Sequence, residues 1–216
     1  MNQLSTIILQ LAVFVVALSI HEFSHAAVAR LLGDETAERQ GRLTLNPLAH
    51  IDPIGTVVLP LVGAIFGVPV IGWAKPTPYN PHNLRYQRWG PLMVALAGPV
   101  SNFLTAFAGG FVLKAVLVWG GLTGDNLLVI VLLTLVLESI LLGVFNLLPI
   151  PPLDGSAILR AIFAAPKYDR FFLSLQRYGF LLIYLLIIAD SFGSISFLGM
   201  LFGAVTSGFL RLMGLG

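Results

Sequence analysis

Long apolar runs constrain the fold of this chain more than any other feature. The first run, residues 4–32, can cross a bilayer as a helix that rises about 1.5 Å per residue. Further runs follow at residues 91–119, 127–148, 171–189 and 197–212. Only 10% of the 216 residues are charged and 57% are hydrophobic, whereas a soluble domain carries roughly 25% charged residues. The chain is therefore predicted to be a polytopic, all-α membrane protein without a separate soluble domain of ordinary size.

The composition also excludes several functions and sites. The formal net charge is +2, and in a membrane protein Lys and Arg are better interpreted as topology signals than as nucleic-acid contacts. No nucleic-acid partner is expected. The chain contains no cysteine, so a metal would have to be held by histidines and carboxylates. Because no basic residue precedes the first apolar run and no small-residue cleavage site follows it, we interpret this run as a retained span.

The segment at residues 54–73 is apolar but interrupted by glycines and prolines, so its course has to be inferred from charge. If the segment is re-entrant, eleven of the twelve Lys and Arg residues share one side, and only Lys114 lies toward the other. If the segment crosses fully, eight of the Lys and Arg residues lie on one side and four on the other, which is a weaker asymmetry. The cytoplasmic side is the one rich in Lys and Arg. This favours a re-entrant segment, the N-terminus outside, and the C-terminus in the cytoplasm of a cell-membrane protein.

A metal-binding pattern lies inside the first apolar run. Residues 20–25 read I-H-E-F-S-H, which contains H-E-x-x-H. Residues four apart share one face of a helix, so His21 and His25 can bind one ion while Glu22 reaches a water on it. The alternative is a pair of buried histidines and a glutamate satisfied by their neighbours. An ionisable residue within a span is costly and usually functional, which favours the metal site.

A catalytic zinc site needs a third protein ligand, and the sequence offers several candidates. His50 and His82 lie in polar segments beside prolines, where a histidine needs no special explanation. Asp154 follows the proline-rich run at residues 149–152, which has to break the preceding helix. It would then lie at the end of a span, at a depth that the two motif histidines could share. An ordinary helix-capping role for Asp154 is the alternative.

Three motifs together resemble the site-2 protease family of intramembrane zinc metalloproteases. They are the H-E-x-x-H at residues 21–25, the pattern N-x-x-P-x-x-P-L-D-G at residues 146–155, and G-P-x-x-N at residues 98–102. In addition, residues 41–52 resemble the membrane-associated β segment that follows the first core helix in this family. The motifs and their connections cover roughly residues 10–160, and their order is more specific than any one of them.

The resemblance implies a set of residue roles. His21, His25 and Asp154 would bind one Zn²⁺ per chain, and Glu22 would be the catalytic base. Asn146 would lie near the site and stabilise the developing oxyanion. The resemblance also implies a transmembrane protein as the substrate. The Lys and Arg distribution places the active site nearer the cytoplasmic side of the lipid bilayer.

The predicted fold has about five to six transmembrane helices, a three-helix catalytic core and a small membrane-associated β segment. We expect a single integral membrane metalloprotease domain over residues 1–216. Its core would lie at roughly 4–160, with accessory C-terminal spans at 171–212. The chain resembles the compact members of the family, without a PDZ module or a regulatory domain. The sequence does not indicate an oligomeric state.

Other functions and roles stay open at this stage. A non-catalytic zinc-binding membrane adaptor is one alternative, and a membrane zinc hydrolase of a non-peptide substrate is another. An intact Glu22 argues against the adaptor, because zinc storage needs no base. Glu138, in the middle of a span, could face the bundle as a gating group or pair with a polar neighbour. Asn102 could hydrogen-bond between helices, either as packing or next to the site.

Overall fold

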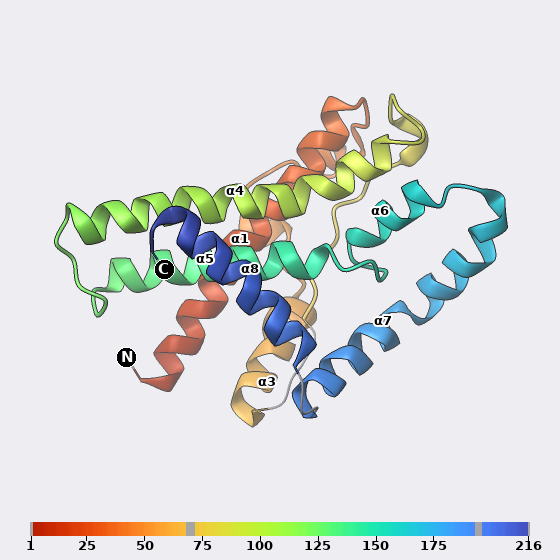
Figure 1. Cartoon of the computed structure of the whole chain (residues 1–216). Helices are drawn as coiled ribbons and strands as arrows, with labels where there is room; N and C mark the ends of the chain where they lie inside the picture. Colours follow the sequence, from red (N-terminus) through yellow and green to blue (C-terminus); the bar gives the residue numbers. More distant parts are fainter. Residues whose placement is uncertain (1, 68–71, 193–195, 216) are drawn as a thin grey trace.

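The computed structural model describes residues 2–67, 72–192 and 196–215, and the described part is helical without a strand. Within these described ranges, four helices are long and apolar enough to cross a membrane. They are α1 (Gln3–Leu31), α4 (Gly90–Val118), α5 (Leu127–Asn146) and α7 (Asp169–Phe192), shown in Figure 1. The protein is therefore a multi-pass membrane protein, as its composition predicts.

The expected number of five to six spans is not confirmed. The last apolar run forms α8 (Phe197–Met213), whose 17 residues reach only about 25 Å at 1.5 Å per residue, less than a hydrocarbon core of about 30 Å. The β segment is not confirmed either. Residues 36–53 form the short helix α2 (Thr36–Arg39), turns and a 3-10 turn at Pro47–Ala49. Side chains satisfy this backbone locally, because Asn46 accepts from Leu48 N and Asp52 from Ile54 N.

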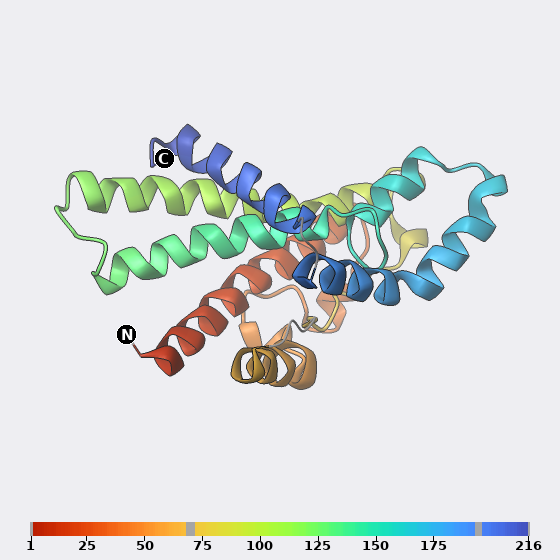
Figure 2. The same ribbon diagram turned by 60° about the horizontal axis from the view of Figure 1, so that its bottom comes forward.

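Helices α1, α4 and α5 pack against one another and form the centre of the molecule. Figure 2 shows α4 and α5 side by side, with α1 next to them. Helices α1 and α4 are antiparallel, since Ala29 packs against Val94 while His21 lies beside Gly98 further along α4. Fully buried small residues, Ala17, Ala26 and Ala29 on α1, allow this close approach without a hydrophobic driving force between helices.

Helix α8 packs on α4 and α5 and runs in the same direction as α4. The ring of Phe209 lies against those of Phe103 and Phe107, and Met213 belongs to the same apolar cluster. Gly214 lies beside the ammonium of Lys114, near the end of α4. Both termini therefore lie toward the side at which α4 ends, on the left in Figure 1. The sequence-based expectation that they lie on opposite sides is not supported, because packing on α4 fixes the direction of this short helix.

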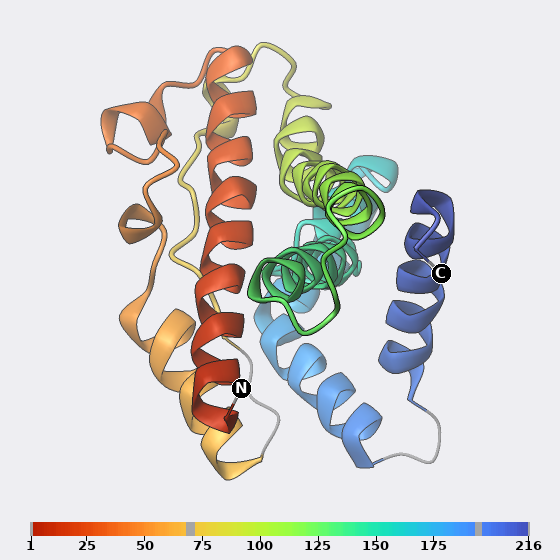
Figure 3. The same ribbon diagram turned by 90° about the vertical axis from the view of Figure 1, so that its left-hand side faces the viewer.

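The two ends of the glycine-rich segment after Asp52 lie side by side. It begins as a π-helix at Pro53–Val58 and continues as α3 (Leu59–Phe66). After residues 68–71, which lie outside the described part, Trp73 N donates to Gly55 O over 3.1 Å. The chain then runs without helix through residues 72–80, which we call the strap. Figure 3 shows the strap beside α1, which brings this loop to the face of α1 that carries Glu22.

Candidate metal centre

Two buried histidines on α1 supply the first two candidate metal ligands. His21 and His25 are 3% and 8% exposed, and their Nε2 atoms lie 3.0 Å apart because the residues are one helical turn apart. They precede the end of α1 at Leu31 by about 9–15 Å, at 1.5 Å per residue. The pair therefore lies inside a helix long enough to span the bilayer, beneath one of its ends.

Asp154 reaches the two histidines from the turn that follows α5. Gly155 lets this turn fold tightly, since a Cβ there would meet the carbonyl oxygen of Leu147 at 2.2 Å. Asp154 precedes α6 (Gly155–Ile162), but its side chain makes no capping bond to that helix. Its Oδ2 lies 3.2 Å from Nε2 of His21 and 3.3 Å from Nε2 of His25. The helix-capping alternative is therefore not what the structure contains.

The other candidate ligands lie elsewhere. His50 is fully buried, and its Nε2 lies 2.7 Å from the carbonyl oxygen of Thr44, whereas His82 is exposed. Among the described residues, only His21, His25 and Asp154 form a group of at least three potential metal ligands. From the residues alone these candidates stayed open, and only the resemblance pointed to Asp154, because the choice depends on how the turn after α5 folds back.

The three ligand atoms fit a zinc ion. Tetrahedral ligands at about 2.0–2.1 Å from zinc lie roughly 3.3–3.4 Å from one another. The observed separations of 3.0, 3.2 and 3.3 Å are close to that spacing. Oδ2 of Asp154 is also buried without an aligned hydrogen bond from the described residues. Burial alone raises the pKa of Asp154, but the two nearby histidines outweigh it and lower the pKa to about 2, so the group is a carboxylate.

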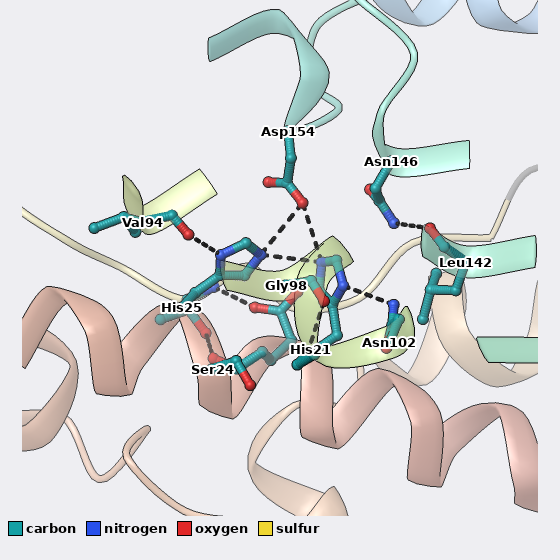
Figure 4. A network of polar contacts seen from close by, with 12 residues as sticks. His21, Ser24, His25, Val94, Gly98, Asn102, Leu142, Asn146 and Asp154 are labelled. Carbon is teal, nitrogen blue, oxygen red and sulfur yellow. Dashed lines mark hydrogen bonds and ion pairs between the residues drawn. The ribbon is translucent and has the colours of Figure 1, made fainter. Parts of the chain in front are cut away.

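Helix α4 supplies the outer partners of both histidines, as Figure 4 shows. Nδ1 of His25 lies 2.7 Å from the carbonyl oxygen of Val94, which only accepts, so Nδ1 carries the proton and Nε2 is free to bind a metal. Nδ1 of His21 lies 3.0 Å from the amide nitrogen of Asn102, whose Oδ1 is buried without a partner among the described residues. If His21 binds metal through Nε2, its Nδ1–H can donate to that oxygen after the amide turns over.

Gly98 makes this arrangement of α1 and α4 possible. A Cβ at Gly98 would lie 2.5 Å from Cε1 of His21 and 2.5 Å from Nε2 of His25, closer than any real contact. The G-P-x-x-N pattern thus places a glycine against both rings and an amide against one of them. The sequence singled out this pattern only by resemblance, and the structure supplies the physical reason for it.

Glu22 and Asn146, the two predicted catalytic residues, have different surroundings. Glu22 is 7% exposed, and its Oε2 accepts a hydrogen bond of 2.9 Å from the backbone N–H of Thr77 in the strap. No sequence pattern indicated this partner, which lies 55 positions further along the chain. Nδ2 of Asn146 donates to Leu142 O over 2.9 Å, which occupies only one of its two amide protons. Its side chain lies near Asp154 in Figure 4.

Ser24, within the H-E-x-x-H motif, and Glu138, which the sequence singled out in a span, do not contribute metal ligands. The hydroxyl of Ser24 donates to Ile20 O over 2.7 Å, a bond within its own helix. Glu138 lines an apolar cavity and makes no hydrogen bond or ion pair with the described residues. It is not one of the groups around the three metal ligands.

Fold and site together define a class, the multi-pass membrane metalloenzymes with an H-E-x-x-H zinc site on a spanning helix. The family model for peptidase family M50 matches residues 122–188, a region that contains Asn146 and Asp154. "Putative zinc metalloprotease YwhC" of Bacillus subtilis is 36% identical over 186 residues, which are 83% of this chain and 80% of that protein. "Putative zinc metalloprotease Rip2" of Mycolicibacterium smegmatis is 30% identical over 198 residues, 88% of this chain and 71% of that protein.

The same-named protein of Mycobacterium tuberculosis is 32% identical over 161 residues, which are 70% of this chain and 56% of that protein. No solved structure matches the chain. The chain belongs to peptidase family M50, the site-2 protease family. Family and ligand geometry together identify the protein as a zinc-dependent metalloprotease.

Proposed function

We propose that this metalloprotease hydrolyses peptide bonds within or near the transmembrane segments of other membrane proteins. The observation that carries the proposal is the position of the metal ligands: His21 and His25 lie within α1, a helix long enough to span the bilayer, and Asp154 meets them there. A substrate has to enter the apolar region to reach a site at that depth. A transmembrane segment of another protein is already there.

The proposed roles follow from the geometry of the site. His21, His25 and Asp154 would hold the zinc ion, with α4 fixing both rings from behind. Bound zinc would supply Lewis acidity that lowers the pKa of water and polarises the scissile carbonyl. Oε1 of Glu22 receives no hydrogen bond from the described residues, so it is the oxygen that would take a proton from water and pass it to the leaving amine.

Asn146 would act on the oxyanion through its second amide proton, the one that Leu142 O does not occupy. Such a donor contributes to catalysis because it is already oriented before negative charge develops. The bond to Leu142 holds the amide in place without using its full donor capacity. This role is proposed from position and donor capacity.

A route for the substrate is offered by a cavity of about 450 Å³ at the face of α1 and α5. Its walls include Phe14, Leu142, Ile187 and Phe202, so it suits an apolar helix. Leu142 also packs on Ala17 and Leu18 of α1, which precede His21 by about one helical turn. Since helical carbonyls are engaged in hydrogen bonds, the substrate has to unwind locally before it is cut.

The orientation and domain organisation belong to the same proposal. The membrane face nearest the metal centre carries most of the Lys and Arg residues, so we assign it to the cytoplasm and place the N-terminus outside. Water would then reach the site from the cytoplasmic end. The whole chain would form one metalloprotease domain, with the catalytic core at roughly 4–160 and accessory helices at 171–212.

A catalytic-base variant tests the proposal. Glu22→Gln keeps the shape of the side chain but cannot take a proton, so turnover should fall by at least about 10²-fold, as expected for loss of a general base. Zinc content, measured by mass spectrometry of the purified protein, should stay at one ion per chain. Membrane proteomes from cells with wild-type or Glu22→Gln protein are then compared for fragments cut within spans.

The outcomes separate the possible functions. Fragments cut within spans only in wild-type cells support the proposal. Cleavage by a zinc-loaded Glu22→Gln protein at the wild-type rate would refute the mechanism. Zinc content without any product would favour a zinc-binding adaptor, and a modified lipid or other non-peptide product would favour a different hydrolase.

A further inference from the structure

The strap contacts Glu22 through one peptide group, and the same group contacts a buried arginine. Thr77 N–H donates to Oε2 of Glu22 over 2.9 Å. The carbonyl of that peptide belongs to Pro76, and its oxygen accepts from Nη2 of Arg42 over 3.2 Å. In a trans peptide the N–H and C=O point in opposite directions. Arg42 and Glu22 therefore lie on opposite sides of one planar unit.

Arg42 is an unusual residue for this position. It is 5% exposed, makes no salt bridge with the described residues, and its Nε and Nη1 are buried without hydrogen-bond partners among them. Its Nη2 also donates to the carbonyl oxygen of Lys75. A buried cation without an ion pair is costly. Glu22 is close enough for its negative charge to oppose the burial that lowers the pKa of Arg42. These contacts point to a role in holding the strap against Glu22.

Hydrogen bonds on both sides of Thr77 fix the position of the strap. On one side of Thr77, Lys75 N donates to His50 O over 3.0 Å. On the other side, Asn80 N donates to Oδ2 of Asp34 over 2.7 Å. The hydroxyl of Thr77 adds a bond of 3.1 Å to the carbonyl oxygen of Glu22. The peptide group that contacts the catalytic base is thus fixed from both ends.

We propose that Arg42 and Thr77 are positioning residues that hold Glu22 for catalysis through the Pro76–Thr77 peptide group. This inference rests on the proposed role of Glu22 as the base. Arg42 polarises the peptide carbonyl, which strengthens the opposite N–H as a donor, since linked hydrogen bonds reinforce one another. The N–H fixes Oε2 and leaves Oε1 for the reacting proton. A long, flexible side chain thereby loses its freedom before the substrate arrives.

An edge for binding an unwound substrate is a weaker interpretation of the strap. Pro76 and Pro78 have no N–H, and the N–H groups of Lys75 and Thr77 already donate to His50 and Glu22. A substrate strand needs alternating free donors and acceptors. This part of the strap offers acceptors only, so a positioning role accounts for its proline pattern better.

The first test needs no substrate. Amide hydrogen exchange at Thr77 is measured by mass spectrometry on the full-length protein in lipid nanodiscs, with and without zinc. Arg42→Met and Glu22→Ala should each raise the exchange rate at Thr77 by at least about tenfold, as expected when a hydrogen bond to a charged group is lost or weakened. Unchanged exchange in both variants would overturn the inference, whatever the protease proves to cleave.

The second test deletes a single donor. Thr77 is replaced by its α-hydroxy acid, which exchanges the N–H for an ester oxygen, and Thr77→Pro serves as a genetic substitute. The assay uses a membrane helix peptide cut by the wild type in the proteome comparison. The turnover number should fall at least about tenfold, a fraction of what a positioned base contributes. KM should change by less than about threefold and zinc should remain bound, because binding groups are untouched.

A matched control and a double variant complete the design. The same ester at Ala74, whose N–H makes no hydrogen bond with the described residues, should leave turnover within about twofold. Adding Arg42→Met to the Thr77 ester should cost little more, because coupled groups are not additive. Two results would show that Arg42 only stabilises the fold. One is that the effects of the two changes on turnover add fully, and the other is that the variant loses its zinc while the turnover of the zinc-loaded protein is unchanged. If Glu22→Gln is fully active, the proposed function itself fails, and that outcome is distinct from all of these.

Discussion

At the residue scale, the geometry of the metal centre requires a glycine at position 98 as well as the three ligands. A side chain at this position has no room between α4 and the two imidazole rings, since a Cβ would come within 2.5 Å of both. The backbone of α4 can then place Val94 O and Asn102 against the outer nitrogens of the rings. Outer partners of this kind orient metal ligands and fix their tautomers.

Gly98→Ala should therefore weaken zinc binding by at least about tenfold, because the added methyl group displaces the rings from their partners. The measurement is zinc affinity by competition with a chelator. Gly203→Ala is the matched control, since nothing lies within 4 Å of a Cβ at that position in α8. Equal affinity in the two variants would contradict the tight packing at Gly98.

Asp154→Ala tests the third ligand. Removing the carboxylate should weaken zinc binding by more than about 100-fold, the upper end for loss of an outer partner alone. Asp169→Ala is the control. That carboxylate pairs with Arg160 at a distance of 2.7 Å and lies away from the metal ligands. If the Asp154 variant keeps zinc with wild-type affinity, another residue is the third ligand.

At the element scale, the end of α1 is tied to the strap by one carboxylate. Asp34 is fully buried and accepts from Thr36 Oγ1, Asn80 N and Asn83 Nδ2, at 2.6 to 2.8 Å. Burial by itself raises the pKa of Asp34, but these hydrogen bonds outweigh it, and the pKa lies below its ordinary value. The fold therefore favours the ionised form and gains stability from it.

This shift predicts a pH dependence. A carboxyl whose pKa is lower in the folded state stabilises the protein above its unfolded pKa of about 3.9, and that stability is lost as the pH falls through the folded value. The melting temperature of Asp34→Asn should therefore be lower than that of the wild type at pH 7. The difference should shrink as the pH falls below about 4. Asp169→Asn is the exposed control, and a difference that stays constant from pH 7 to pH 3 would argue against the role of Asp34.

At the scale of the whole molecule, the end of the bundle with the metal centre carries most of the positive charge. The described helices place the end of α1, the start of α4 and the end of α5 together there, which brings all three ligands to one depth. The two ends of the loop after Asp52 lie side by side, because Trp73 N donates to Gly55 O.

Cysteine labelling tests this topology in a chain that has no native cysteine. His82→Cys lies at the end nearest the metal centre, and Gly124→Cys lies in the turn between α4 and α5, and both positions are exposed. A membrane-impermeant reagent added to intact cells should label residue 124 only, and residue 82 should react after permeabilisation. Labelling of residue 82 from outside would reverse the proposed orientation.

Most of the elements were predictable because membrane spans and the metal motif are local patterns. The run at residues 4–32 gives α1, and its H-E-x-x-H spacing places His21 and His25 on one face. The segment at residues 36–53 was predicted less well. Within it, residues 41–52 were expected by resemblance to form a β segment, but Asn46 and Asp52 satisfy the backbone locally, and no strand forms in the described part.

The sequence by itself determined the class of molecule, since 57% hydrophobic residues and long apolar runs cannot be buried in a soluble domain of this size. It also determined the two histidines and the glutamate, because four-residue spacing on a helix fixes a common face. Only the tertiary structure showed that Asp154, which the sequence singled out by resemblance alone, meets both histidines, whereas His50 and His82 do not join this group in the described part. It also placed Arg42 and Thr77 around Glu22, because contacts between distant segments depend on how the chain folds back.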